Sequence, residues 1–584
     1  MGAVVIHLVA QGSSLLFGAS GLSNLRLAYS NDQLGYMTIA ANVRVGIDGN
    51  PEPVTLTGVN NYPRDYYTIV GLVARIFHLQ VVQAWNFTAI AVQVVMIAVL
   101  AALLIRLTGR NWAGLLAPTP FVAGIGAWLI SGSWMIHLGS SHATLWGPFG
   151  VLFSLNGEAA GISCVIISVC LVIMTWDQRI SIPKKRVLRV IAALLIGMIA
   201  GFQTYSFLTG CYLLAFVIAV VGLYEKRSRI SWISSAALVL VVFLIGPLIS
   251  EHIGQLPTLV FGLIIAVPGL WLHLRIQKFR WIGYLAITAV LACFQVIPTL
   301  VAQIGGDPFL HYRVASNQDL GVVYPLSLVV LLFAAIPLLF CLRSALSMNS
   351  RHVVGISLGS LVTLVMVATN NVWGPNTEPY RMALDGLIYC FVAIPVCLAM
   401  LSGAVSGIAA SGAAQIFSLP ATDEQSGKKF LAAVVAGITM FAIGLPDFFL
   451  FATSPSTREM WDSSAAEPRA VQQVLTHMDT SKGLLLTDPC ADPRTTKVLT
   501  SVPVNYYFLG MAWPERRDAV QQVMDDRTSG IIQAGHLHSA GVGYVMTQSS
   551  CQIHWQDMYP ELLEKVASAP VAGTEESYTL WSVR

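Results

Sequence analysis

The stretch Tyr29-Ser-Asn-Asp-Gln-Leu-Gly-Tyr36 follows the first apolar segment of the chain and places an acidic residue, Asp32, where that segment should meet water. Asparagine and aspartate are favoured at helix N-termini, so Asn31 and Asp32 can cap a helix that begins here. A carboxylate at the water boundary is also suited to proton transfer. Helix capping and proton transfer are compatible roles. The composition and layout of the rest of the chain provide evidence on proton transfer.

The chain of 584 residues is far more apolar than a soluble protein. Hydrophobic residues make up 55% of it and charged residues 11%, with a mean hydropathy of +0.67, whereas about a quarter of the residues of a soluble domain are charged. This composition indicates a multi-span membrane protein. The net charge is only +3, and no basic run is interleaved with aromatic residues, so we expect no nucleic-acid partner.

Thirteen apolar segments are candidates to cross a hydrocarbon layer of about 30 Å. They lie at 3–20, 84–105, 113–133, 149–175, 190–202, 207–222, 232–250, 258–274, 282–302, 323–342, 353–369, 386–409 and 430–452. For the first segment a cleaved signal peptide is the alternative, although it lacks a basic flank. Either interpretation leaves Asp32 on the same side of the membrane.

The distribution of lysine and arginine predicts the orientation, because these residues are retained in cytoplasmic loops. With the N-terminus inside, the cytoplasmic loops hold seventeen basic residues, and the opposite loops before residue 453 hold six, Arg26, Arg44, Arg64, Arg75, Arg313 and Arg381. The sequence therefore predicts a multi-pass plasma-membrane protein with a cytoplasmic N-terminus. It places residues 21–83 and the tail from residue 453 outside.

Two long segments outside the membrane carry secondary-structure patterns of their own. Within the first external loop, 21–83, apolar spacing predicts two helices at about 32–45 and 64–79 that lie along the membrane surface. In the tail, helical patterns at about 466–478, 515–533 and 556–567 alternate with strand-like runs at 483–487, 503–508, 542–546 and 578–582. We expect a transmembrane module over residues 1–452 and an extracytoplasmic α/β domain over 453–584.

Two of the nine cysteines, Cys490 and Cys551, lie in this tail, and the other seven fall in apolar spans. An oxidising compartment would allow Cys490 and Cys551 to form a disulfide. The alternative is two unrelated thiols.

Polar residues gather in several of the predicted external loops. Asp65 lies at the start of the second surface helix, where it is either a second carboxylate or an acid placed to complement the helix dipole. Arginine suits a phosphate through its planar fork, although each arginine could instead contact a headgroup or an acid. The candidates for substrate binding are Arg64, Asp65, His311, Arg313, Glu378 and Arg381.

This layout resembles the GT-C superfamily of integral-membrane glycosyltransferases of the bacterial cell-envelope type. The resembling features are a first span ending in the acidic residue of "SNDQLGY", a long first external loop with two helices, about a dozen further spans and a soluble domain on the same side. The resemblance implies an all-α polytopic fold and a polyprenyl-phosphate sugar donor. It implies that Asp32 is the catalytic residue, and it leaves open a divalent cation, Mg²⁺ or Mn²⁺, held by Asp32 and Asp65.

The predicted reaction moves a sugar from the lipid phosphate to a hydroxyl of a cell-envelope glycan, lipid or protein on the extracytoplasmic side. Asp32 would take the proton of that hydroxyl, and Arg313 and Arg381, with His311 and Arg64 behind them, would hold the phosphate. A lipid or solute transporter or flippase is the alternative. Transporters place ionisable residues near the midplane and often contain a repeat, and this chain has few acids in its spans and no evident repeat. A non-catalytic scaffold would make Asp32 dispensable.

Overall fold

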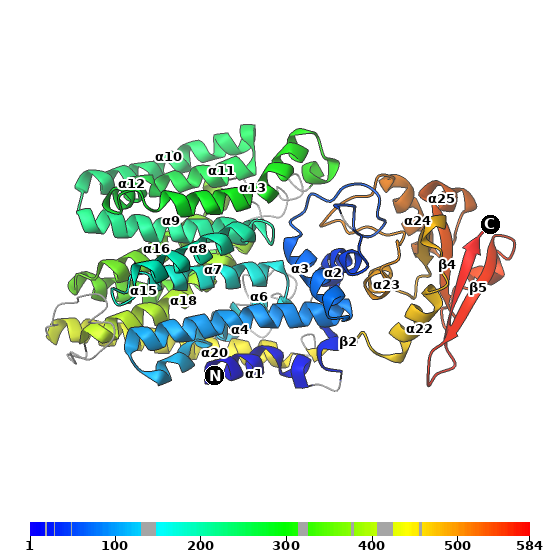
Figure 1. Cartoon of the computed structure of the whole chain (residues 1–584), viewed down its shortest axis with the longest axis horizontal. Coiled ribbons are helices and arrows are strands. Elements are labelled where there is room, and N and C mark those ends of the chain that lie inside the picture. The colour runs from blue at the N-terminus through cyan, green and yellow to red at the C-terminus, as the bar shows by residue number, and fades with distance from the viewer. Residues whose placement is uncertain are drawn as a thin grey trace. The chain divides into compact units, whose positions relative to one another are not determined.

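The computed structural model describes residues 1–17, 20–27, 30–47, 49–129, 148–312, 325–374, 379–405, 424–454 and 458–584. Within these residues, nine helical segments are long and apolar enough to cross a membrane. They are α4 (Val81–Thr108), α7 (Gly157–Met174), α9 (Thr204–Lys226), α10 (Arg229–Ile253), α11 (Gln255–Gly262) continuing into α12 (Val267–Ile276), α13 (Ile282–Ile304), α16 (Arg351–Ala368), α18 (Pro379–Val405) and α20 (Glu424–Thr453). Figure 1 shows that neighbouring helices of this set run side by side. The protein is a polytopic α-helical membrane protein.

Further helices complete the described apolar part of the chain. They are α1 (Gly2–Phe17), α6 (Pro148–Ser154), α8 (Ile182–Ile199), α15 (Pro325–Ser347) and the single turn α17 (Asn370–Trp373). The segment expected at 149–175 is interrupted between α6 and α7, where Leu155 has a φ of +55° and the Asn156 side chain accepts hydrogen bonds from the backbone N–H groups of Glu158 and Ala159.

The span predicted over 113–133 is wrong for the part of it that the structure describes. Residues up to 129 form three short 3₁₀ turns, η3 (Asn111–Leu116), η4 (Thr119–Phe121) and η5 (Ala127–Leu129). Pro118 and Pro120 supply no backbone N–H and disfavour a helix at the residues before them. The Asp447 carboxylate accepts hydrogen bonds from the backbone N–H groups of Ile125 at 2.9 Å and Trp128 at 3.0 Å, so a side chain satisfies donors that a helix would satisfy internally.

The chain divides into two compact units, each made of three segments. The membrane unit contains Met1–Gly12, Ala89–Ile297 and Val314–Ser454, and the second unit contains Ser13–Thr88, Pro298–Arg313 and Pro455–Arg584. The first loop and the tail therefore belong to one unit, which we call the loop–tail unit.

Both helices predicted in the first loop are present in the loop–tail unit. They are α2 (Ser30–Arg44) and α3 (Asp65–Ile76). Before them, the short strand β1 (Asn24–Arg26) pairs antiparallel with β2 (Met460–Asp462) from the start of the tail. Beyond α2, Val54 is fully buried in the same apolar core as Leu485 and Met546 of the tail, so the loop contributes to the core of the tail domain.

The tail is an α/β domain built on a four-stranded mixed sheet in the order β3-β4-β6-β5. The strands β3 (Leu484–Thr487) and β4 (Val542–Gln548) are parallel, and β6 (Ser577–Val583) lies antiparallel to both β4 and β5 (Leu563–Pro570). Alternate strand residues enter two different cores, as period-two side-chain geometry requires: Leu485 and Met546 in one, Leu486 and Val545 in the other. The helices are α22 (Ala466–Leu475), α23 (Pro493–Thr500), α24 (Arg517–Ser529), α25 (Ala534–Ala540) and α26 (Trp555–Met558).

Two predictions for the tail fail. The helix expected at 556–567 ends at Met558 as α26, and the chain then enters β5 because that segment pairs with β6. The run at 503–508 forms only an isolated bridge, between Val504 and Leu485. The helices α23 and α25 were not predicted.

Candidate functional site

Asp32 lies in the first turn of α2 and is exposed. An acid at this position complements the positive end of the helix dipole. One turn further along the same helix face, Gly35 and Tyr36 face Phe508 of the tail. A Cβ atom added at Gly35 would lie 2.7 Å from the Phe508 ring, so a side chain there would push α2 away from the tail.

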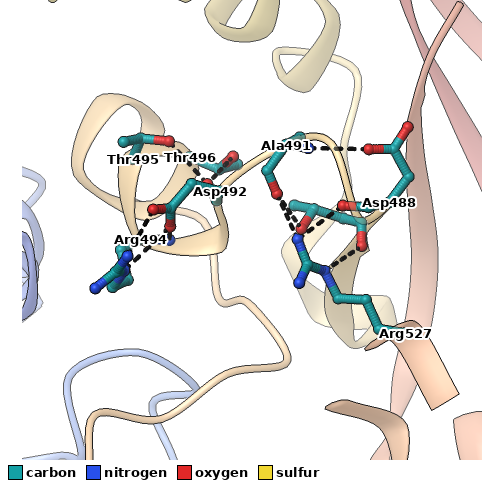
Figure 2. A network of polar contacts seen from close by, with 8 residues as sticks. Asp488, Ala491, Asp492, Arg494, Thr495, Thr496 and Arg527 are labelled. Atoms are coloured by element: carbon teal, nitrogen blue, oxygen red, sulfur yellow. Dashed lines mark hydrogen bonds and ion pairs between the residues drawn. The ribbon is translucent and has the colours of Figure 1, made fainter. Parts of the chain in front are cut away.

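Opposite α2 in the loop–tail unit stands α23, whose N-terminus is fixed by Asp492. Its carboxylate accepts a hydrogen bond from the backbone N–H of Arg494 at 2.7 Å, and Pro493 takes the first helical position, where its missing N–H costs nothing. The same carboxylate accepts from the Arg494 guanidinium, at 3.2 Å from Nε and 2.8 Å from Nη2. Figure 2 shows this two-point pairing, which fixes the direction of the arginine fork.

Arg494 is the arginine of the tail on which the charge of Asp32 acts. Its side chain is 18% exposed, and its guanidinium carbon lies 5.9 Å from the centre of the Tyr506 ring. The pKa of Arg494 is raised: burial works against its charge but is outweighed by the hydrogen bonds and charge of Asp492, to which Tyr506 and Asp32 add. The structure thus brings a carboxylate of the first loop within electrostatic range of an arginine of the tail.

Packing between the loop and the tail holds these two residues in place. The Ser501 hydroxyl, just past α23, donates to the Ala41 carbonyl of α2 at 2.8 Å, and the Val504 N–H donates to the Val54 carbonyl at 3.1 Å. Both contacts are short hydrogen bonds between segments far apart in the sequence. They make α2 and α23 neighbours.

A column of stacked aromatic rings lies beside Asp32. Tyr36, one helical turn beyond Asp32, stacks on Tyr67 with ring centres 5.0 Å apart and on Tyr62 at 5.5 Å, and Tyr67 stacks in turn on Trp85 at 5.7 Å. The Tyr62 hydroxyl donates to the Tyr36 hydroxyl at 3.2 Å. Tyr67 and Trp85 are buried and Tyr62 is half-buried, so the column presents its Tyr62 end toward the surface.

A second arginine fixes the loop that leads into α23. Arg527 donates to three backbone carbonyls, those of Thr487 at 2.9 Å, Asp488 at 2.8 Å and Ala491 at 2.8 Å. The Asp488 carboxylate accepts from the N–H groups of Cys490 and Ala491, each at 3.0 Å. Burial raises the pKa of Asp488, although those bonds and the charge of Arg527 oppose the shift.

Cys490 in this loop forms a disulfide with Cys551, with Cα atoms 5.7 Å apart. These two sulfurs and the Asp488 carboxylate form the one group of three close potential metal ligands among the described residues. Sulfur binds zinc as a thiolate. With the disulfide formed, this group is therefore a structural brace and a poor metal site.

The other predicted site residues fall in different places. Arg64 precedes α3 and donates to the Gly49 carbonyl; burial lowers its pKa, and Asp65 opposes that shift. Asp65, in the first turn of α3, has its pKa raised by partial burial against the charge of Arg64. His311 is exposed and belongs with Asp32, Arg64 and Asp65 to the loop–tail unit. Neither Asp32 nor Asp65 joins a group of three potential metal ligands in the described part of the chain.

Three predicted residues cannot be placed. Arg313 and Glu378 lie outside the described residues, and for Arg381 the backbone belongs to α18 but the side chain lies outside the description. Sequence reasoning missed Asp492, Arg494 and Tyr506. The dipeptide Asp492-Pro493, a cap followed by proline at the first helical position, was a readable helix start, but nothing local indicated that this helix would face Asp32.

No family model and no curated protein matches the chain. Among solved structures, it is similar to the archaeal oligosaccharyltransferase AglB from Archaeoglobus fulgidus in complex with an inhibitory peptide and a dolichol-phosphate, at 13% identity and a TM-score of 0.46, over 94% of this chain and 69% of that one. It is similar to ArnT from Cupriavidus metallidurans bound to undecaprenyl phosphate, at 13% identity and a TM-score of 0.46, over 99% and 97%.

A third similar structure is the arabinofuranosyltransferase AftD from Mycobacteria, at 12% identity and a TM-score of 0.47, over all of this chain (100%) but 39% of that one. These neighbours are GT-C glycosyltransferases, the superfamily that the sequence resembles. All three TM-scores lie below 0.5, so the roles of individual residues rest on this chain alone.

Proposed function

We propose that the protein is a membrane glycosyltransferase that moves a sugar from a polyprenyl-phosphate donor to a hydroxyl of a cell-envelope glycan, lipid or protein. The observation that carries this proposal is the exposed carboxylate of Asp32, in the first turn of the helix that follows the first apolar segment in the sequence, within electrostatic range of Arg494 and one turn before the stacked Tyr36. A carboxylate, a fixed cation and aromatic rings are the groups that a sugar-transfer site needs.

The reaction assigned to this site is a single displacement. The acceptor hydroxyl gives its proton to the Asp32 carboxylate as its oxygen attacks the anomeric carbon of the donor sugar. The bond between that carbon and the phosphate oxygen breaks, and the lipid phosphate leaves with the bonding electrons. Because the leaving phosphate is already anionic, the protein's main contribution on that side is positive charge held in place beforehand.

The proposed phosphate ligands are Arg313 and Arg381, and His311 and Arg64 are proposed to assist them. Arginine is suited to this task because its fork can donate two parallel hydrogen bonds to a phosphate. Asp65 and Glu378 are proposed to bind hydroxyls of the substrate. Arg494 is proposed to act through Asp32: its guanidinium is fixed by Asp492, so its positive charge acts on the carboxylate from a fixed place.

The described residues fit a divalent cation at Asp32 and Asp65 poorly. Mg²⁺ and Mn²⁺ are usually bound through carboxylates, but neither Asp32 nor Asp65 belongs to a group of three close potential ligands among the described residues, and the positive charge of Arg494 within electrostatic range of Asp32 would repel a metal ion. We therefore expect transfer to continue in the presence of EDTA at nearly the untreated rate. A complete loss of transfer that added Mg²⁺ or Mn²⁺ restores would instead establish the metal site.

The proposed location is the plasma membrane, with the N-terminus cytoplasmic and the tail outside. The uneven distribution of basic residues between alternate loops supports this orientation. The disulfide between Cys490 and Cys551 is consistent with an oxidising compartment for the tail.

The proposed activity is tested with purified full-length protein in liposomes that contain labelled polyprenyl-phosphate sugars, with envelope glycans and lipids as acceptors. We expect the label to move from the polyprenyl lipid into a new glycosidic bond. If the label only crosses the bilayer, still attached to its lipid, the protein is a flippase and the proposal is wrong.

A further inference from the structure

An apolar cavity of about 440 Å³ lies within the membrane unit, bounded by α4, α15, α18, α20 and the turns η3 and η4. Its volume falls in the range of about 300–1,000 Å³ that is typical of small-molecule pockets. All of its lining residues belong to one compact unit. The cavity therefore does not depend on how the two units are arranged.

Two prolines inside helices contribute to the wall of the cavity. Pro337 of α15 and Pro395 of α18 both line it. A proline inside a helix removes one backbone hydrogen bond and bends the helix. On the facing wall, Gly437 of α20 has no side chain, and a Cβ atom there would lie 3.5 Å from Leu398 and 3.7 Å from Ile394, which are ordinary contacts. An alanine at position 437 would therefore fit without filling the cavity.

The hydroxyl groups in the lining are already satisfied. Three hydroxyls line the cavity, and each donates to a carbonyl of its own segment: Thr108 to Leu104 at 2.8 Å, Thr119 to Leu116 at 2.7 Å, and Ser402 to Ala399 at 2.8 Å. A pocket for a polar solute aims a few polar groups at its ligand. Because these hydroxyls donate to backbone, the lining suits a hydrocarbon.

The rim of the cavity has residue types that are typical of a membrane boundary. Trp112 and Ile438, both in the lining, are 55% and 62% exposed, so the cavity opens outward. Arg110 is exposed two residues before Trp112, and Lys429 precedes the lining residue Phe430. Tryptophan is enriched at membrane interfaces, and basic residues there attract anionic headgroups.

We propose that this cavity binds one acyl chain of an anionic phospholipid from the surrounding bilayer, with the phosphate beside Arg110 and Lys429. The chain would fill the gap opened by Pro337 and Pro395. This site is independent of the glycosyl transfer proposed above, and neither proposal needs the other to hold.

The test measures lipid binding directly. The purified, delipidated full-length chain is titrated with phosphatidylglycerol and, separately, with phosphatidylcholine, and bound lipid is counted by native mass spectrometry. Gly437→Phe fills the cavity from α20, Ala399→Phe fills it from α18, and Gly437→Ala is the matched control. Thermal unfolding and gel filtration identify any filled variant that does not fold.

We expect the wild type and Gly437→Ala to bind one phosphatidylglycerol in preference to phosphatidylcholine. Either folded filling variant should bind it about tenfold more weakly, or worse. Replacing Arg110 and Lys429 by glutamine should remove the preference for the anionic lipid. Equal binding by the filled variants and the control would overturn the proposal, and so would displacement of phosphatidylglycerol by an equimolar polyprenyl phosphate.

Discussion

At the scale of single residues, the proposed glycosyl transfer depends mainly on Asp32 and Arg494. They lie in different helices, far apart in the sequence, and contribute opposite charges to one surface of the loop–tail unit. The Asp492 carboxylate accepts two hydrogen bonds from the Arg494 guanidinium. Arg494 is therefore preorganised and loses little conformational entropy when it orients Asp32.

Arg494→Gln should lower kcat for transfer by about tenfold to a hundredfold, because misplacing a catalytic group by about 1 Å has effects of that size. KM for the donor should change little, since Arg494 acts on Asp32 in this account. Arg494→Lys keeps the charge but loses the fork, and it should recover part of the rate. Steady-state kinetics of purified variants provide the measurement.

The matched control is Arg516→Gln, which removes an exposed arginine of the same domain that donates to the Ser539 carbonyl. It should behave like the wild type. A raised KM for Arg494→Gln at unchanged kcat would mean that Arg494 binds the donor directly.

Asp32 could be identified from the sequence because its position depends on local features, namely the end of an apolar segment and a helix start. Arg494 could not. Its own helix start was readable at Asp492-Pro493, but its position opposite Asp32 depends on the hydrogen bonds from Ser501 to Ala41 and from Val504 to Val54. Such contacts between distant segments leave no periodicity in the sequence.

At the scale of elements, two buried ionisable residues, one in the loop after α2 and one in α23, interact electrostatically. Glu52 and Lys497 are both fully buried. The Glu52 carboxylate accepts from the N–H of Val54 at 3.0 Å and from the N–H and hydroxyl of Thr55, while the Lys497 ammonium donates to the Ser501 carbonyl at 2.8 Å. Lys497 lies one turn beyond Arg494, so this pair helps to set the position of α23.

Burial raises the pKa of Glu52 to about 7, against its hydrogen bonds and Lys497, and lowers the pKa of Lys497 to about 7, against Glu52. Between the ordinary glutamate pKa and 7, the folded chain keeps a proton that the unfolded chain has lost, so the stability due to Glu52 falls as pH rises. Between 7 and the ordinary lysine pKa, the unfolded chain holds the extra proton, so stability rises with pH. The pair's contribution should be smallest near pH 7.

The thermal midpoint of unfolding as a function of pH, for the wild type and for Glu52→Gln/Lys497→Met, checks this prediction. The difference between the two curves should have its minimum near neutral pH, and a flat difference would contradict it. Glu52→Gln alone should be less stable than the double variant, because it leaves the lysine buried without the opposite charge of Glu52.

The secondary-structure predictions were correct where one apolar periodicity dominated the sequence. They were wrong where the apolar composition or helix propensity of a segment conflicted with its prolines or its long-range contacts. The helices α2 and α3 follow the apolar spacing of the first loop. Residues 113–129 are apolar enough for a span, but Pro118 and Pro120 outweigh composition. The segment Leu563–Pro570 contains helix-forming residues, yet it becomes β5 because pairing with β6 and burial of Leu563 and Ala569 stabilise it more.

At the scale of the whole molecule, the account requires Asp32 and the tail to lie on the same, external side of the membrane. The membership of the first loop and the tail in one compact unit agrees with this requirement. The division into a module of residues 1–452 and a domain of 453–584 stays a prediction, since contacts group residues 13–88 with the tail.

Cysteine labelling of intact cells tests this orientation. A membrane-impermeant maleimide should label Glu575→Cys, an exposed position of the tail, without permeabilisation. Lys226→Cys, exposed at the end of α9 on the predicted cytoplasmic side, should react only after permeabilisation. The reverse pattern would place Asp32 in the cytoplasm, and labelling of the wild type supplies the background.

The most direct test of the central claim compares Asp32→Asn with Asp518→Asn in the transfer assay with labelled polyprenyl-phosphate sugars. Asp518 is an exposed acid in the first turn of α24, as Asp32 is in α2, so both variants lose the same charge from the first turn of a helix. We predict that Asp32→Asn slows transfer by about 10²–10⁴-fold, the range expected for a general base, while Asp518→Asn keeps the wild-type rate. Equal product from Asp32→Asn and the wild type would contradict the account and reduce Asp32 to a residue of the helix terminus.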